Sequence, residues 1–197
     1  MFSLPSDEVP VMLSFAIISD IHGCFPALQK TLDHAQQFAP DYYLVLGDIL
    51  NHGPRNPVPE GYAPPLVAEA LNELREKIIA VRGNCESEVD QMLLQFPCLA
   101  PHNQLLVDSR RWFMTHGHLY GAETLPLVAG DVLLSGHSHV AGIEQDAKGI
   151  CRINPGSITF PRNGAEPSYA IYQHGALNII GLQTERVLDS IQLSALL

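Results

Sequence analysis

Seven carboxylate, amide and imidazole side chains stand at the ends of apolar runs in this sequence. They are Asp20, His22, Asp48, Asn84, His116, His137 and His139. Taken singly, such residues usually have an ordinary role, because an Asp often caps a turn and a lone His is often a core or surface residue. Together they offer only oxygen and nitrogen donors, which predicts a site for hard to borderline divalent cations such as Mn²⁺, Fe²⁺, Zn²⁺ or Mg²⁺.

The apolar runs that precede these residues are predicted to be β-strands. The first three cover 13–20, 42–48 and 77–84. Asp20 and Asp48 then fall at the carboxyl ends of strands, where the ligand sites of open α/β sheets gather. Because Asp20 and His22 are two residues apart, an extended backbone would turn both side chains to one face, where they could bind one ion. His137 and His139 have the same spacing.

The remaining elements predict an α/β fold. Helices are expected over 26–38, 65–77 and 87–94. The last of these begins with a capping-box pattern of Ser87 and Asp90. From Gln104 onward, short strands follow at close spacing, mostly antiparallel and with little helix until the last turns. The sum predicts two mixed β-sheets packed face to face with helices outside, and the Pro- and Gly-rich loop 53–65 is long enough to shape a pocket.

Length and composition are typical of a compact, folded protein. The 197 residues are 46% hydrophobic and 16% charged, and no linker-like run divides them. We therefore expect a loose N-terminal arm over residues 1–11 and a single domain over 12–197. The formal net charge of −10 disfavours long nucleic acid as a partner and favours small phosphate esters held by metal ions.

Membrane and redox signals are weak in this chain. The apolar segment 11–18 is too short to span a bilayer, and Asp7 and Glu8 before it have the wrong charge for a secretory signal. We therefore expect a cytoplasmic protein with no membrane partner. The four cysteines show no CxxC spacing, which argues against a structural zinc site or a redox pair and predicts free thiols.

Five short blocks, in a fixed order, resemble the signature motifs of the calcineurin-like metallophosphoesterases. They are DIHG (20–23), GD (47–48), GN (83–84), THGH (115–118) and GHSH (136–139). The resemblance covers roughly residues 12–180, and four longer segments are similar to a phosphodiesterase group within that superfamily. These segments are 50–56, 59–64, 81–97 and 153–157. The NPGS turn at 154–157 would then lie near the metals in a structural role.

The resemblance implies a four-layer αββα arrangement and a site for two divalent ions, with Mn²⁺ as the first choice. One ion would be held by Asp20, His22, Asp48 and His139, and the other by Asp48, Asn84, His116 and His137. Asp48 would bridge them, since a carboxylate can face two cations about 3.5–4 Å apart. Two such ions would balance the two aspartates, a hydroxide and a diester anion. The implied reaction is hydrolysis of small phosphodiesters by attack of a hydroxide that bridges the metals.

Two departures from the family pattern concern the residues around the metals. Many relatives carry His after the Asn of the third block, where this chain has Cys85. That thiol is either a weak general acid or a packing residue behind Asn84. Relatives that cleave monoesters often have GDxxDRG, whereas this chain has GDILNHG at 47–53. Candidate substrate contacts are Asn51, His52, Arg55, His118 and Arg82. Candidate catalytic residues are Asp48, Asn84, His52 and Cys85.

Several alternatives stay open from the sequence. The same site could serve a phosphomonoester, a cyclic nucleotide or a dinucleotide, or the chain could be a catalytically silent scaffold like the retromer subunit that resembles these enzymes. Arg55 could instead be a solvated charge or a subunit contact, and His118 could orient a metal ligand. The resemblance is compatible with a homo-oligomer. His34, His102 and His174 have no such neighbours, and we expect them at the surface.

Overall fold

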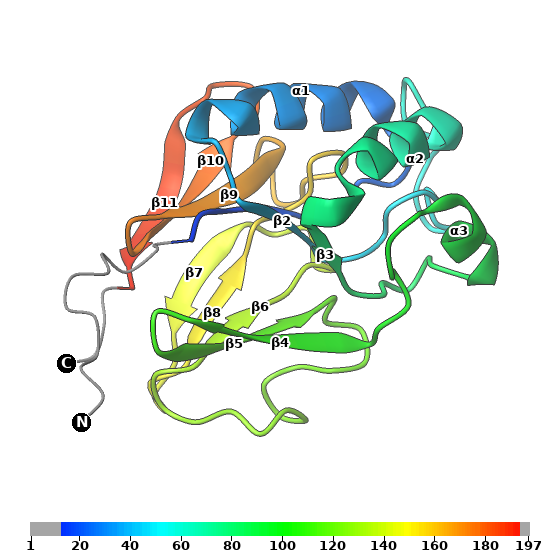
Figure 1. Ribbon diagram of the computed structural model, residues 1–197. Helices are drawn as coiled ribbons and strands as arrows, with labels where there is room; N and C mark the ends of the chain where they lie inside the picture. Colours follow the sequence, from blue (N-terminus) through cyan, green and yellow to red (C-terminus); the bar gives the residue numbers. More distant parts are fainter. Residues whose placement is uncertain (1–12, 194–197) are drawn as a thin grey trace, which may run out of the picture.

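The computed structural model describes residues 13–193, and the arm expected over 1–11 lies outside the described residues. Two β-sheets form the body of the molecule (Figure 1). The first sheet holds β1 (Phe15–Ile18), β2 (Tyr42–Val45), β3 (Ile78–Ala80), β9 (Ser168–Gln173), β10 (Ala176–Gly181) and β11 (Val187–Gln192). The second holds β4 (His102–Val107), β5 (Arg110–Thr115), β6 (Val132–Leu134), β7 (Gly142–Gln145) and β8 (Cys151–Asn154).

Both sheets are mixed, as the sequence predicted. The first has the order β11-β10-β9-β1-β2-β3, in which β1, β2 and β3 run parallel and the other neighbours antiparallel. The second has the order β4-β5-β6-β8-β7, in which β6 is parallel to both β5 and β8. Because parallel strands end at the same edge of a sheet, the segments after β1, β2 and β3 come together, and so do those after β5 and β6.

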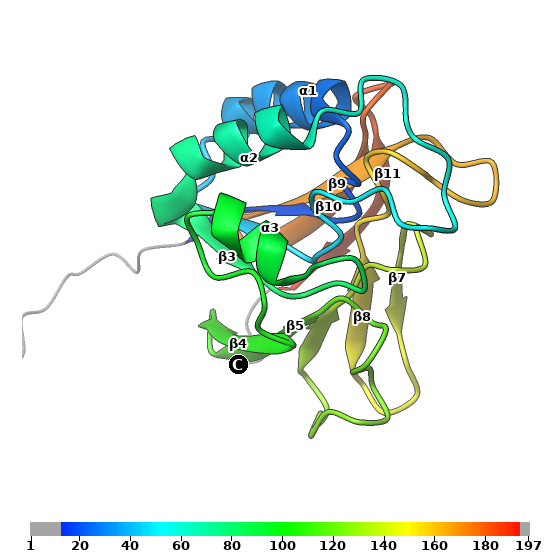
Figure 2. The same cartoon turned by 90° about the vertical axis from the view of Figure 1, so that its right-hand side faces the viewer.

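Helices cover the outer face of the first sheet. They are α1 (Phe25–Ala35) and α2 (Pro64–Glu73), which lie on the same side of that sheet in Figures 1 and 2. Pro26 occupies the first turn of α1, where the N–H that proline lacks would have no helical partner. Leu28 of α1 and Leu71 of α2 are buried against the face of the sheet that carries Ile18. Burial of each leucine stabilises the fold by roughly 2 kcal/mol.

A second apolar layer lies between the two sheets. Ile17 of β1 and Leu44 of β2 point into it, and Trp112 and Met114 of β5 meet them from the second sheet. All four side chains are fully buried. Successive residues of a strand face opposite sides, so the continuous apolar runs in the sequence reflect strands that are covered on both faces.

The outer face of the second sheet carries no helix among the described residues. Phe113 and Leu133 on that face pack instead against Leu125 and Leu127 of the irregular segment that connects β5 to β6. The remaining helix, α3 (Glu88–Leu93), begins with the expected capping box, in which Ser87 N–H donates to the Asp90 carboxylate at 2.7 Å. The two-sheet sandwich is therefore confirmed, with a loop in place of one helical layer.

Three further expectations need correction. Where the last helical turns were expected, Val187–Gln192 form strand β11, and residues 194–197 lie outside the described residues. The third strand is only Ile78–Ala80. His34 is buried, because its ring lies on the inner side of α1 with Nδ1 2.5 Å from the Tyr169 hydroxyl, whereas His102 and His174 are exposed as expected. No helix within residues 13–193 is long and apolar enough to cross a bilayer.

Candidate metal centre

The predicted ligands lie where the strand ends of the two sheets meet, but not in extended backbone. Asp20, His22 and Asp48 have φ of 56°, 50° and 54°, and His137 and His139 have φ of 65° and 57°. This is the left-handed region, which costs non-glycine residues roughly 1–2 kcal/mol each. The prediction that extended backbone turns the pairs Asp20/His22 and His137/His139 to one face was therefore wrong. Five strained residues in one cluster indicate a site rather than ordinary turns.

Two glycines let the loops after β2 and β3 approach each other closely. Gly47 has φ of 93°, and a Cβ on it would collide with the backbone of Gly83. A Cβ on Gly83 would in turn collide with Asp48. The GD and GN blocks therefore require glycine because the two loops are in contact there, and at Gly47 also because of its positive φ.

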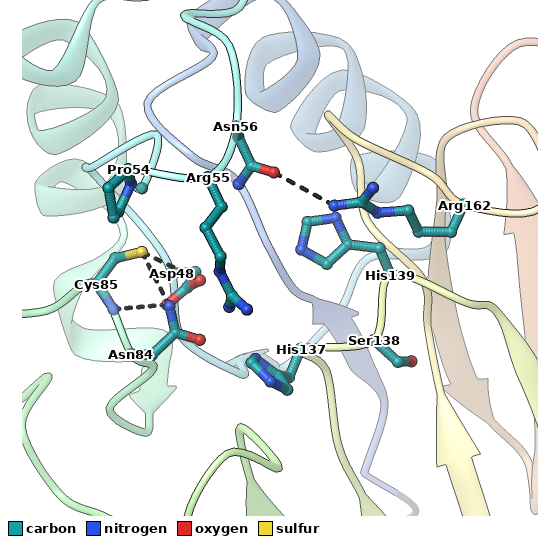
Figure 3. A pocket seen from close by; sticks show the side chains of 11 residues that line it. Asp48, Pro54, Arg55, Asn56, Asn84, Cys85, His137, Ser138, His139 and Arg162 are labelled. Atoms are coloured by element: carbon teal, nitrogen blue, oxygen red, sulfur yellow. Dashed lines mark hydrogen bonds between the residues drawn. The ribbon is translucent and has the colours of Figure 1, made fainter.

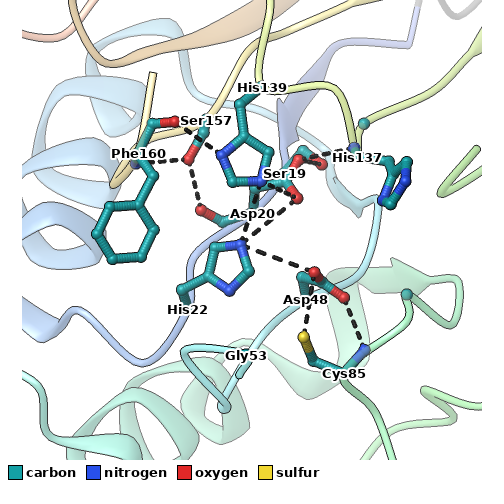
Figure 4. Close-up of polar contacts among 12 residues, drawn as sticks. Ser19, Asp20, His22, Asp48, Gly53, Cys85, His137, His139, Ser157 and Phe160 are labelled. Carbon is teal, nitrogen blue, oxygen red and sulfur yellow. Dashed lines mark hydrogen bonds and ion pairs between the residues drawn. The ribbon is translucent and has the colours of Figure 1, made fainter. Parts of the chain in front are cut away.

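The Asp20 carboxylate is the centre of the cluster (Figure 4) and is fully buried. Its Oδ2 accepts hydrogen bonds from Ser19 Oγ at 2.7 Å and from His137 N–H at 3.0 Å. Its Oδ1 has no hydrogen-bond partner but lies 3.2 Å from His139 Nε2 and 3.7 Å from His22 Nε2. A buried carboxylate oxygen left open toward imidazole nitrogens fits a cation between them.

Backbone carbonyls fix which nitrogen of each imidazole faces this centre. Nδ1 lies 3.0 Å from Asn51 O in His22, 2.7 Å from Leu46 O in His116 and 2.7 Å from Phe160 O in His139. A carbonyl oxygen can only accept, so each Nδ1 carries the proton and donates. In the neutral imidazole, each Nε2 then presents a lone pair to the interior, as metal-binding histidines do.

Asp48 lies between the two halves of the cluster. Its Oδ1 is 3.5 Å from His116 Nε2, and its Oδ2 is 3.7 Å from His22 Nε2. On the His116 side, Asn84 Oδ1 lies 3.2 Å from the same Nε2, and the His137 ring is centred 5.1 Å from the His116 ring. All seven predicted ligands are therefore neighbours, with Asp48 facing both halves.

The charges of the cluster, like its geometry, favour binding of cations. Burial opposes ionisation of Asp20, yet the nearby imidazoles of His139, His22 and His116 lower its pKa overall. Burial likewise opposes protonation of His22, but Asp20 and the Asn51 carbonyl raise its pKa overall. The pKa of His137 is lowered by burial and by His116, which keeps its ring neutral. Two carboxylates and inward-facing lone pairs, with no side-chain cation among them, form a site suited to divalent ions.

Glu86 supports the loops that carry the ligands, and our reading of the sequence missed it. It is buried, and its carboxylate accepts hydrogen bonds from Asp48 N–H at 3.0 Å, from Ile49 N–H at 2.6 Å and from Gly83 N–H. Burial first, and the charge of Asp48 second, raise the pKa of Glu86 to about 7. The position of Glu86, two residues after the predicted ligand Asn84, was the one sequence feature that could have indicated this supporting role.

Ser157 of the NPGS turn was also missed as an individual residue. It is fully buried, and its Oγ donates to Asp20 O at 2.8 Å. The same oxygen accepts from Phe160 N–H at 2.8 Å and Thr159 N–H at 3.1 Å. Phe160 in turn offers its carbonyl to His139. The turn therefore connects the Asp20 segment with the support of His139 (Figure 4).

A cavity of about 230 Å³ opens over the cluster (Figure 3) and is mostly lined by polar side chains. Of the candidate substrate contacts, only Arg55 lines it, together with Arg162, which our reading of the sequence did not single out. The Asn51 side chain instead accepts a hydrogen bond from Gly53 N–H at 2.8 Å. The His52 ring packs against Tyr62 with ring centres 5.4 Å apart.

His118 and Arg82 also lie outside the lining of this cavity. The His118 ring is centred 5.3 Å from the ring of His116, and burial followed by the charge of His116 lowers the pKa of His118. Arg82 donates its backbone N–H to Ala100 O at 2.7 Å.

Cys85 contacts Asp48 instead of merely packing behind Asn84. Its N–H donates to Asp48 Oδ1 at 2.9 Å, and its thiol donates to Asp48 Oδ2 at 3.3 Å. Burial, followed by the negative charge of Asp48, raises the pKa of this thiol well above its usual range. Cys85 therefore stays protonated at neutral pH, with its proton directed to a carboxylate.

Comparison with known proteins decides the family. Residues 13–175 match the model of the calcineurin-like phosphoesterase superfamily domain. The chain belongs to the calcineurin-like phosphoesterase superfamily. Within that superfamily it is 47% identical to phosphodiesterase YfcE of Escherichia coli over 93% of this chain and 100% of that protein. It is also 32% identical to the probable metallophosphoesterase YsnB of Bacillus subtilis, over 81% of this chain and 83% of that protein.

The fold of this phosphoesterase agrees with the sequence comparison. The solved structure of E. coli YfcE, described as a phosphoesterase, matches it with a TM-score of 0.89 and 46% identity over 92% of this chain and all of that one. The resemblance seen in the five sequence blocks is therefore confirmed by sequence and by structure.

Proposed function

We propose that this protein is a metal-dependent phosphodiesterase that hydrolyses small phosphodiesters in the cavity above Asp20 and Asp48. One observation carries the proposal. In a buried cluster, Asp20 Oδ1 accepts no hydrogen bond, and the unprotonated Nε2 atoms of three imidazoles converge toward it. The similarity to a relative named as a phosphodiesterase supports it.

The proposed ligands divide into two sets that share Asp48. The first set is Asp20, His22, Asp48 and His139, and the second is Asp48, Asn84, His116 and His137. Within residues 13–193, the ligand atoms of Asp20, His22 and His139 of the first set lie within 4.8 Å of one another, and those of Asp20, Asp48 and His116 do so across the two sets. The position of Asp48, with one oxygen toward each set, supports its role as the bridge.

Oxygen and imidazole donors without thiolate suit Mn²⁺, and also Fe²⁺, Zn²⁺ or Mg²⁺. Two bound ions of this kind would supply Lewis acidity toward a phosphoryl oxygen and toward a nucleophilic water. The chain's own contribution is to fix Nε2 of three histidines by their Nδ1 hydrogen bonds and to keep the buried Asp20 ionised.

The surroundings of the site favour diesters with good leaving groups. Cys85 directs its proton to Asp48 and holds it tightly, which makes it a poor general acid. His52 and His118 do not line the cavity, so neither is placed to protonate a leaving group there. A phosphodiester whose leaving group needs no proton is the substrate that this arrangement serves best.

A broad hydrolysis screen tests the proposal. Purified protein reconstituted with Mn²⁺ is assayed on an aryl diester, an aryl monoester, cyclic nucleotides and a dinucleotide. We expect the aryl diester to be cleaved fastest. Faster cleavage of the monoester or of a nucleotide would replace the substrate class. Bound ions without hydrolysis of any ester would favour a silent scaffold.

The wider setting of the enzyme follows from the same features. We propose a single domain over 12–197 that acts in the cytoplasm on small diesters, without long nucleic acid or membrane as partner. The net charge of −10 supports the exclusion of nucleic acid. A homo-oligomer is compatible with these features, and light scattering in solution decides it.

A further inference from the structure

Two arginines stand at the boundary between the cavity over the metal-ligand cluster and a second cavity. Arg55 and Arg162 both line the first cavity, which also includes Asp48 and His139. Both also line an adjoining cavity of about 320 Å³, whose other walls include Phe160 and residues of the same two loops. Figure 3 shows the Arg55 side chain reaching down among the residues that line the first cavity.

Neither guanidinium has a carboxylate partner. Within the part of the chain that the structure describes, no carboxylate oxygen lies within 4.0 Å of Arg55 or Arg162. Arg111 and Arg152, in contrast, form ion pairs at 2.6 and 2.8 Å. In a chain with 21 acidic and 11 basic residues, two unpaired arginines at one cavity boundary indicate an anionic ligand.

Hydrogen bonds connect the loops that carry the two arginines with each other and with the metal-ligand cluster. Arg162 N–H donates to His139 O at 3.1 Å, and its guanidinium donates to Asn56 Oδ1 at 3.4 Å (Figure 3). Asn56 is itself tied to its loop through His52 O at 2.9 Å. These hydrogen bonds fix the Arg162 backbone beside His139 and connect the Arg162 guanidinium to the loop that carries Arg55.

The charge balance gives the class of anion. Two divalent ions held at the cluster would be neutralised by Asp20, Asp48, the nucleophile and a diester anion, so the scissile group would leave the two guanidiniums unmatched. A phosphate monoester carries about −1.5 to −2 at pH 7, which matches two guanidiniums, and its oxygens suit the planar arginine fork. A carboxylate would supply only one negative charge.

We infer that Arg55 and Arg162 form a second phosphate subsite, and that the substrate is a phosphodiester that carries a further phosphate monoester group. This inference rests on the proposed function and specifies its substrate class. Phe160 and the prolines Pro57 and Pro161 provide apolar walls beside this subsite in the adjoining cavity.

A matched pair of substrates tests the subsite. The pair is the p-nitrophenyl ester of thymidine 5′-phosphate, with and without a phosphate group on the 3′-hydroxyl. Release of p-nitrophenolate reports only diester cleavage. For the Mn²⁺-loaded enzyme we expect kcat/KM to be roughly tenfold or more higher for the phosphorylated member, because charge-assisted hydrogen bonds are the strong ones.

Arg162→Met keeps most of the side-chain volume and removes the charge. We expect it to lower kcat/KM for the phosphorylated substrate so that the ratio between the two substrates falls toward one. Arg75→Met is the matched control, since Arg75 is exposed near the amino end of β3 and contacts only its neighbours Glu76 and Asn72 O among the described residues. It should leave both rates unchanged.

Each contrary outcome is distinct. A wild-type enzyme that cleaves both substrates equally well retains the proposed function and overturns the inference. An equal loss on both substrates in Arg162→Met assigns that arginine to the scissile phosphate and also overturns it. If neither substrate is cleaved, the proposed function fails, and calorimetric binding of thymidine 3′,5′-bisphosphate against thymidine 5′-phosphate still decides the subsite. Equal affinities there would overturn it.

Discussion

Ser157 is the residue whose removal tests most sharply how the fold supports the candidate metal centre. Ser157→Ala deletes a buried oxygen that makes three hydrogen bonds, to Asp20 O, Phe160 N–H and Thr159 N–H. At about 1 kcal/mol net for each bond, the loss is about 3 kcal/mol. For a protein of this size that lowers Tm by roughly 6–12 °C.

The same substitution should weaken metal binding. Phe160 O accepts the Nδ1 proton of His139 at 2.7 Å, and loss of Ser157 releases the turn that holds this carbonyl. Removing a residue that orients a ligand typically lowers metal affinity by roughly 10–100-fold. Urea unfolding of chelator-treated protein measures the stability, and calorimetric titration with Mn²⁺ measures the affinity.

Ser14→Ala is the control for this experiment. Ser14 also uses its hydroxyl for two hydrogen bonds, donating to Asp41 Oδ2 at 2.9 Å and accepting from Asp41 N–H at 3.2 Å, but it precedes β1 at the end away from the ligands. It should lower stability by about 1–2 kcal/mol and leave Mn²⁺ affinity unchanged. Wild-type Mn²⁺ affinity in Ser157→Ala would refute the supporting role of the turn.

Three other predictions follow from the site and the core. Cys85→Ser keeps a donor to Asp48, so aryl diester hydrolysis should change less than about threefold; a loss of several orders of magnitude in steady-state assays would show general-acid work. Burial raises the pKa of Cys151 from 9.0 to about 11, so the unfolded chain loses this proton first and the free energy of unfolding should fall between pH 9 and about 11. In urea melts across that range, the free energy of unfolding should fall more steeply with pH for wild type than for Cys151→Ala. Equal pH dependence in the two proteins would contradict the assignment. Mn²⁺ at 100 times its Kd should stabilise the metal-free protein by about 2.7 kcal/mol in thermal melts, and an unchanged Tm would argue against a metal site.

The ends of the strands before Asp20 and Asp48 could be predicted from sequence because strands buried on both faces appear as continuous apolar runs. The runs before Asp20 and Asp48 are continuous and apolar, since one strand face meets the helices and the other meets the second sheet. Parallel pairing of these strands then brings their carboxyl ends together. That is why residue type and order were enough to gather the candidate ligands into one cluster.

Other features left no comparable signal. The left-handed backbone at Asp20 and His22 depends on contacts with the loop after β2, to whose backbone both residues donate their N–H groups, and spacing alone does not reveal it. Strand β11 was missed because it is a mostly exposed edge strand without an apolar pattern. His34 was misplaced because it lies on the buried side of α1 beside Tyr169, a partner 135 residues away in sequence.

The substitution Asp48→Asn tests the central claim most directly, since Asp48 faces the two halves of the cluster with separate carboxylate oxygens. Metal content per chain, measured by elemental analysis after reconstitution with Mn²⁺, is compared with the turnover of an aryl diester by the same samples. The wild-type protein should hold two ions and cleave the diester. Asp48→Asn should retain at most one ion and lose most of its turnover. Two ions and near wild-type turnover in Asp48→Asn would contradict the account.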